Sequence, residues 1–205
     1  MPPSLLLIAA QALTMAQMQP IGPADYPEDK LRGEKSAAVI VEVFVGTDGK
    51  ALRCNQQTAI GDTSFGEFTC RKLQKRHWKP ARLRDGTTSP ALYFDVIRWF
   101  VPGNRIGDQV GMASMKPDIV LNVQSLPAGQ KGPVNLNTVI LVNEDGSIIQ
   151  CDGDKPEADQ AFVRAACGSL LGRQFIKTSS IDGKPTAYVS KARVQFIVDP
   201  GLPVN

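Results

Sequence analysis

Four cysteines and a single histidine carry the most recognisable chemistry in this 205-residue chain. Cys54 and Cys70 stand sixteen positions apart, and Cys151 and Cys167 repeat that spacing. A zinc site or a redox-active pair would call for a C-x-x-C spacing or a second histidine. Of the three pairings that four cysteines allow, the repeated spacing therefore predicts the structural disulfides Cys54–Cys70 and Cys151–Cys167, with no metal ligands and no cofactor.

His77 is the only histidine, so any catalytic relay through an imidazole depends on it. A hydrolytic triad requires a nucleophile and an acid positioned around that ring. The sequence contains no G-x-S-x-G, no H-E-x-x-H and no phosphate-binding glycine loop, and its carboxylates are scattered. We therefore expect no catalytic residues, and an unrecognised hydrolase stays open as one alternative function.

A dense run of basic residues surrounds this histidine. Two pairs of them stand four residues apart, which places each pair on one face of a helix. Such a cluster could contact an acidic peptide or an anionic envelope polymer, or it could be a solvated helix end that suits the helix dipole. No aromatic stacking surface accompanies the charges, so nucleic acid is not an expected partner. The candidate basic patch consists of Arg71, Lys72, Lys75, Arg76 and Lys79.

The overall composition is that of an ordinary globular protein. Hydrophobic residues make up 42% and charged residues 21%, which argues against a disordered tail, a collagen-like fibre and a multi-span membrane protein. The net charge of +3 is too small to predict a nucleic-acid partner. Composition alone therefore indicates a globular protein but no particular activity.

An internal repeat organises the chain. A constant offset of 97 residues relates the first cysteine pair to the second (54 to 151, and 70 to 167). Coincidences at one offset without a gap indicate a duplicated unit. The same offset relates Asp48 to Asp145, Phe65 to Phe162, Leu73 to Leu170, Arg76 to Arg173, and Asp85-Gly86 to Asp182-Gly183.

Each unit has the same expected order of elements. Alternating apolar residues around an Asp-Gly turn predict a β-hairpin, and apolar residues at helical spacing then predict an amphipathic helix across it. The fold class is therefore α+β, with two tandem repeats that each form a three-stranded antiparallel sheet with a helix packed across it. The hairpin strands are expected at 39–45 with 51–54 and at 138–142 with 147–151, and the final strands at 92–101 and 187–198.

The repeats suggest two domains. Domain 1 is expected to cover 25–102 and to open with a short helix at 26–33 that ends at Gly33. Residues 103–116 form the linker, and each half should then fold on its own. Domain 2 covers 117–200, and its divergent opening is either a strand or an irregular arm.

The N-terminal segment has the composition of a secretory leader. Residues 1–24 carry no charged side chain, and their apolar run is shorter than the roughly 20 residues that a spanning helix needs. We expect a signal peptide at 1–16, cleaved after Thr14-Met15-Ala16; a buried N-terminal helix is the alternative. Disulfides and secretion both require an oxidising compartment, so the sequence predicts a periplasmic mature chain without a membrane span.

The first unit resembles the C-terminal domain of TonB-type energy transducers. The resemblance covers 25–102 and rests on Asp25-Tyr26-Pro27, on the hairpin, and above all on the helix end His77-Trp78-Lys79-Pro80-Ala81. The second unit lacks the Tyr-Pro and has Phe175-Ile176-Lys177-Thr178 at the Pro-Ala step, as in a degenerate copy. The resemblance implies pairing with an extended peptide, such as a segment of an outer-membrane transporter. The family's membrane helix and Pro-rich spacer are missing here, so we expect no force transmission.

The final strand of the first unit is the candidate binding edge. Both of its faces are apolar, which fits either an exposed strand that accepts a peptide or a strand packed on the other domain. The leading expectation is a periplasmic, non-catalytic module that binds an extended peptide by strand addition. A structural subunit of an envelope or transport assembly, of undetermined oligomeric state, is the alternative. The candidate edge residues are Leu92, Phe94, Val96, Arg98 and Phe100.

Overall fold

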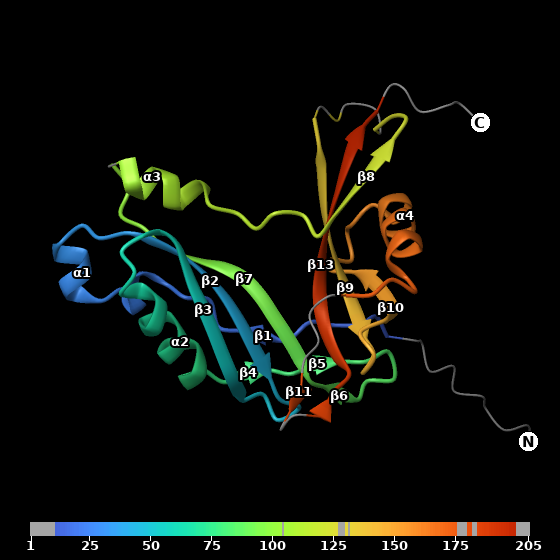
Figure 1. The fold of residues 1–205 in the computed structure, drawn as a ribbon, viewed down its shortest axis with the longest axis horizontal. Helices are drawn as coiled ribbons and strands as arrows, with labels where there is room; N and C mark the ends of the chain where they lie inside the picture. Colours follow the sequence, from blue (N-terminus) through green and yellow to red (C-terminus); the bar gives the residue numbers. More distant parts are fainter. Residues whose placement is uncertain are drawn as a thin grey trace, which may run out of the picture.

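Figure 1 shows a computed structural model of the chain, an α+β fold with a mostly β-sheet core. The structure describes residues 11–103, 105–126, 130, 132–175, 180–181 and 184–199. The turn at Asp182-Gly183 and the end of the Phe175–Thr178 step lie outside this part of the chain. The helices are α1 (Glu28–Arg32), α2 (Phe65–Lys75), α3 (Arg105–Met112) and α4 (Gln160–Leu170), with a short 3-10 turn η1 (Pro23–Asp25) before α1.

One seven-stranded sheet runs through the molecule, in the order β10-β9-β13-β7-β2-β3, with β8 beside β13. Its strands are β2 (Ala37–Val45), β3 (Ala51–Gly61), β7 (Ala91–Trp99), β8 (Ile119–Val123), β9 (Val134–Val142), β10 (Ile148–Gly153) and β13 (Tyr188–Val198). Three two-stranded sheets join β1 (Gln17–Met18) to β4 (Trp78–Lys79), β5 (Ala81–Arg82) to β6 (Thr88–Ser89), and β11 (Ser180–Ile181) to β12 (Lys184–Pro185).

The two halves meet through their final strands. β7 and β13 are parallel neighbours, but only Ala91–Val189 and Leu92–Ser190 are paired. Beyond these pairs the two strands diverge, as Figure 1 shows, and β8 takes the place of β7 beside β13 from Val194 to Val198. The separate three-stranded sheets expected from the sequence are therefore joined into one continuous sheet.

The hairpin turns are built alike in both halves. Gly49 has φ +76°, and a Cβ at this position would lie 2.1 Å from the Trp78 carbonyl oxygen. The close approach allows the Trp78 N–H to donate to the Gly49 carbonyl at 2.9 Å. Ninety-seven positions later, Phe175 N–H donates to the carbonyl of Gly146, whose φ is +87°. Each turn is thereby tied to the residue that follows the helix of its own half.

Alternate residues of a strand face opposite sides of a sheet, and the two helices use opposite faces. One core packs Val39, Val41 and Val43 of β2 against Phe65 and Leu73 of α2. The neighbouring residue Phe44 points to the other face. There it joins Leu92, Tyr188 and the α4 residues Phe162, Ala166 and Leu170 in a second core. The second core thus takes side chains from both halves of the sequence.

Both connecting segments contain regular secondary structure, which the sequence predicted only for the second of them, as one of two alternatives. The expected linker contains α3, whose Val110 is buried against Ala38 and Val96 of the first half. The divergent opening of the second half contains the short strand β8. The expected short helix is confirmed as α1, and its C-cap Gly33 donates its N–H to the Asp29 carbonyl at 3.1 Å.

The expected leader extends into the folded core. Residues 1–10 lie outside the described residues, whereas Leu13, Met15 and Ala16 are only 2%, 5% and 3% exposed in the first core. Cleavage after Ala16 would remove these three side chains from that core. Among the described residues, no helix has the length and hydropathy needed to cross a membrane.

Candidate functional site

The cysteines are paired as their spacing predicts. Cys54 of β3 is bonded to Cys70 of α2 with a Cα–Cα distance of 5.6 Å, and Cys151 of β10 to Cys167 of α4 at 5.4 Å. Each disulfide fixes a helix to the second strand of the hairpin that precedes it. The disulfides therefore have a structural role, and their four sulfur atoms are not free thiols that could react.

Most of the candidate basic patch is engaged in ion pairs. Lys72 Nζ lies 3.5 Å from Asp25 Oδ1, and the Arg76 guanidinium contacts Oδ2 of the same carboxylate. The Gly22 N–H, followed by Arg76 and Lys72, holds the pKa of Asp25 below its ordinary value against the opposing effect of burial. Arg71 pairs with the exposed Glu67 at 3.3 Å. These three cations tie α2 to the N-terminal segment or to its own preceding turn.

The remaining two basic residues line a surface hollow. Lys75, His77 and Lys79 are exposed around it, and β1 forms the opposite wall. The hollow shares no lining residue with the cavity beside β7 described below. The structure therefore separates the basic patch from the candidate binding strand, which the sequence had led us to combine.

The candidate binding strand is an inner strand of the sheet at its first two residues only. β7 pairs with β2 along its whole length, from Ala91–Val45 to Trp99–Ala37, and with β13 at Ala91 and Leu92. The expectation of an edge strand is therefore corrected at Leu92, where the second half attaches to the side of β7 that was expected to be open.

The apolar second face of β7 is covered by the rest of the molecule. Leu92 is buried in the core of the second half, and the Arg193 guanidinium lies 5.6 Å from the centre of the Phe94 ring. Val96 packs against Val110 of α3, while Phe100 remains 46% exposed beyond the strand end. Packing between the halves thus accounts for Leu92 and Phe94, as the second interpretation of this face proposed.

Among the described residues, no strand pairs with the outer backbone of β7 at Val96 and Arg98. The Ser190 hydroxyl donates to the Leu92 carbonyl, and the Arg193 guanidinium donates to that of Phe94. Backbone groups alternate sides in an antiparallel pair, so Val96 and Arg98 also direct their backbone groups away from β2. The Val96 N–H reaches only the side chain of Asp95, at 2.8 Å. Side chains, rather than a strand, therefore contact this backbone at Leu92, Phe94 and Val96.

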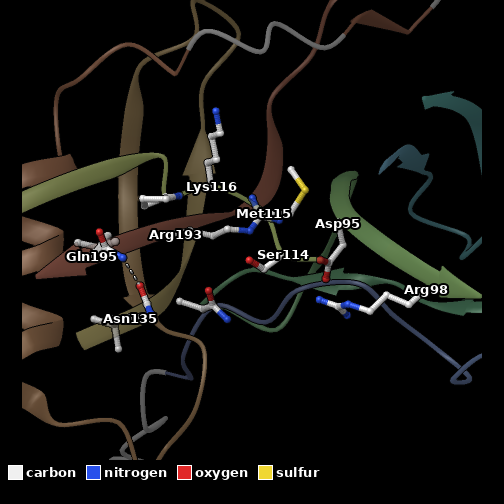
Figure 2. A pocket seen from close by; sticks show the side chains of 12 residues that line it. Asp95, Arg98, Ser114, Met115, Lys116, Asn135, Arg193 and Gln195 are labelled. Atoms are coloured by element: carbon white, nitrogen blue, oxygen red, sulfur yellow. Dashed lines mark hydrogen bonds between the residues drawn. The ribbon is translucent and has the colours of Figure 1, made fainter. Parts of the chain in front are cut away.

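A cavity of about 460 Å³ occupies the wedge between the diverging strands. Asp95 and Arg98 of β7 face Asn135 of β9, Arg193 and Gln195 of β13, and the connecting residues Ser114 to Lys116 (Figure 2). We call this space the wedge. Its full lining is Asp95, Arg98, Ser114, Met115, Lys116, Pro117, Asn135, Leu136, Asn137, Arg193, Val194 and Gln195.

The wedge is polar and carries an excess of positive charge. Arg98, Lys116 and Arg193 are its cations, and Asp95 is its only anion. Arg98 Nε donates to the Ala113 carbonyl at 2.6 Å, and Arg193 Nη1 lies 3.5 Å from Asp118. The sequence indicated Arg193 only as part of a half-buried strand, since nothing local shows that it faces β7.

The described residues contain no cluster of three or more His, Cys, Asp or Glu side chains arranged to hold a metal ion. His77 is exposed beside the hollow at β1, away from the wedge lining. Comparison of the chain with protein-family models, with curated proteins and with solved structures returned no match.

Proposed function

We propose that this protein is a non-catalytic module of the cell envelope that binds an extended peptide by strand addition to the outer side of β7. The observation that carries the proposal is the outward backbone of Val96 and Arg98, which lies beside the wedge and has no strand partner among the described residues. A peptide strand there would gain main-chain hydrogen bonds, while the wedge would select its side chains.

The TonB-like resemblance supports this proposal, as does the similar construction of the two halves. The strand order β3-β2-β7 in the first half recurs as β10-β9-β13 in the second. Trp78 and Phe175, which follow the helices, also donate equivalent hydrogen bonds to the hairpin turns, at the same offset of 97 residues. We therefore interpret the chain as two tandem TonB C-terminal-like repeats, with the second repeat docked on the first.

The charges that line the wedge indicate which side chains the bound peptide should carry. Three cations and one carboxylate line the wedge, and one of the cations, Arg193, pairs with Asp118. The remaining excess of positive charge would favour acidic residues in the peptide, and binding would weaken with added salt. The Asp95 carboxylate would have to release the Val96 N–H, which then becomes the donor to the peptide. The two disulfides are consistent with an oxidising compartment, and we propose the periplasm.

Replacement of Val96 by proline tests the proposal, because proline removes the outward N–H. Peptides enriched from a displayed random library on the wild-type protein should lose binding to Val96→Pro by about tenfold or more, the effect of losing a well-placed main-chain bond and its neighbours. Val96→Ala keeps the N–H and should retain binding. Enriched peptides should carry an excess of Asp and Glu.

A second variant covers the case in which Val96→Pro does not fold. Arg98 is exposed, so Arg98→Glu should leave the fold intact while reversing one charge of the wedge. Acidic peptides should then bind more weakly, and the salt dependence should decrease. Unchanged binding of the enriched peptides by folded Val96→Pro would exclude strand addition at β7, and unchanged binding by Arg98→Glu would exclude the proposed selection of acidic residues by the wedge.

A further inference from the structure

The N-terminal segment forms an added strand in a second place on the molecule. Residues 14–18 run antiparallel to 78–82 in constant register, with Thr14 opposite Arg82, Gln17 opposite Lys79, and Met18 opposite Trp78. Thr14 and Arg82 exchange two backbone hydrogen bonds of 3.0 Å each. Figure 1 shows β1 of this segment next to β4.

The segment also fills an apolar slot. Leu13, Met15 and Ala16 are buried in the same core as Trp78 and Ala81. Thr14 and Gln17 are exposed. Leu13 and Met15 lie on one face of this extended segment, and Ala16 is buried on the other.

The opposite side of this acceptor strand is already paired at two residues. Ala81 and Arg82 of β5 pair with Ser89 and Thr88 of β6. These two residues are therefore inner strand residues only while 14–18 are in place. Without them, the Arg82 N–H and carbonyl and the slots of three apolar side chains would be exposed together at a strand edge.

Polar contacts fix the ends of the segment. The Arg84 carbonyl accepts from Gln11 N–H at 3.2 Å, and Asp152 Oδ2 accepts from Leu13 N–H at 3.0 Å. At the other end Arg76 Nη1 donates to the Gln19 carbonyl at 3.3 Å. All of these bonds go to the backbone of the segment, so they would serve any peptide of the same length and apolar pattern.

We infer that residues 78–84 are a peptide-acceptor strand, which binds an extended peptide with uncharged, apolar side chains at its first, third and fourth anchoring positions. Residues 13–16, Leu-Thr-Met-Ala, are its resident occupant in the intact chain. Processing after Ala16 would vacate the strand and leave it open to a partner segment of the same chemistry. This site is separate from the wedge, and neither depends on the other.

Exchange of the resident segment in the full chain tests this inference. A protease site inserted after the exposed Gln19 allows the segment to be cut while the rest of the protein remains intact. A fluorescent peptide of residues 11–19 should enter the cut protein, giving saturable anisotropy, and should not enter the uncut protein. The Val96→Pro variant, cut in the same way, should exchange normally.

Matched peptides establish the mode of binding. Met15→Asp in the probe should weaken binding by about tenfold or more, because an unpaired carboxylate would be buried. Gln17→Asp introduces the same charge at an exposed position and should bind no more weakly than the parent peptide. Equal binding of the Met15→Asp peptide, failure of the cut segment to exchange, or unfolding on its release would each overturn the inference.

Discussion

Arg193 is the residue that connects the two halves at the wedge. Its guanidinium lies over the Phe94 ring and donates to the Phe94 carbonyl, and it also pairs with Asp118 before β8. One side chain thus occupies the position that a neighbouring strand would take beyond Ser190. The planar guanidinium has several fixed donors, so lysine would not reproduce these contacts.

At the turn, Gly49→Ala should destabilise the protein more than Gly172→Ala. Both glycines have positive φ, +76° and +77°, but only at Gly49 would the new Cβ meet a backbone oxygen, at 2.1 Å. At Gly172 the free energy of unfolding should fall by about 1 kcal/mol, because only the backbone conformation is unfavourable for alanine. At Gly49 it should fall by roughly 2 kcal/mol or more. Chemical denaturation of both variants measures the difference, and equal losses would contradict the close approach to Trp78.

Asp25 should make stability depend on pH. Its folded-state pKa is lowered, so its contribution is present above the unfolded value of about 3.9 and is lost as the pH falls through the folded value. Asp25→Asn should therefore lower the free energy of unfolding by about 1 kcal/mol at pH 7, and by progressively less as the pH falls below about 3.9. Asp29→Asn, on the exposed side of α1, serves as the control. A pH-independent loss would show that the ion pairs with Lys72 and Arg76 are not the cause.

At the scale of elements, each disulfide acts between one strand and one helix. Replacing both Cys54 and Cys70 by alanine should lower the free energy of unfolding by about 3 kcal/mol, the chain-entropy value for a loop of this length. The same change at Cys151 and Cys167 should cost about as much, because the loops are equal. Urea denaturation of the two double variants tests this, and a loss at only one pair would contradict equivalent roles.

Local features could be predicted from the sequence, and long-range pairing could not. The Asp-Gly turns and the cysteine spacing each depend on short stretches of chain, and they correctly placed the hairpins, the helices after them and both disulfides. The junction between β7 and β13 depends on two residue pairs about 98 positions apart, for which no local pattern exists. The sequence predicts a signal peptide at 1–16, with a buried helix as the alternative, because an uncharged apolar run contains no local signal for the short strand at Gln17–Met18.

At the scale of the whole molecule, the continuous sheet makes the halves interdependent. Phe44 and Leu92 of the first half are 2% and 1% exposed, in a core that consists otherwise of second-half residues. We now expect 11–103 and 105–199, expressed separately, to be unstable or to aggregate, and to regain stability when mixed. Circular dichroism and sedimentation of each half and of the mixture test this. Two independently stable halves would contradict a shared core.

The central claim is that a peptide adds as a strand to the outer side of β7, and hydrogen exchange tests it most directly. With a library-selected acidic peptide bound, the account predicts slower exchange of the Val96 and Arg98 amides, which face the wedge. The amides of Asp95 and Ile97 face β2 and should change little. Protection that appears instead at β3 or at 78–84, with the Val96 and Arg98 amides unchanged, would contradict the account.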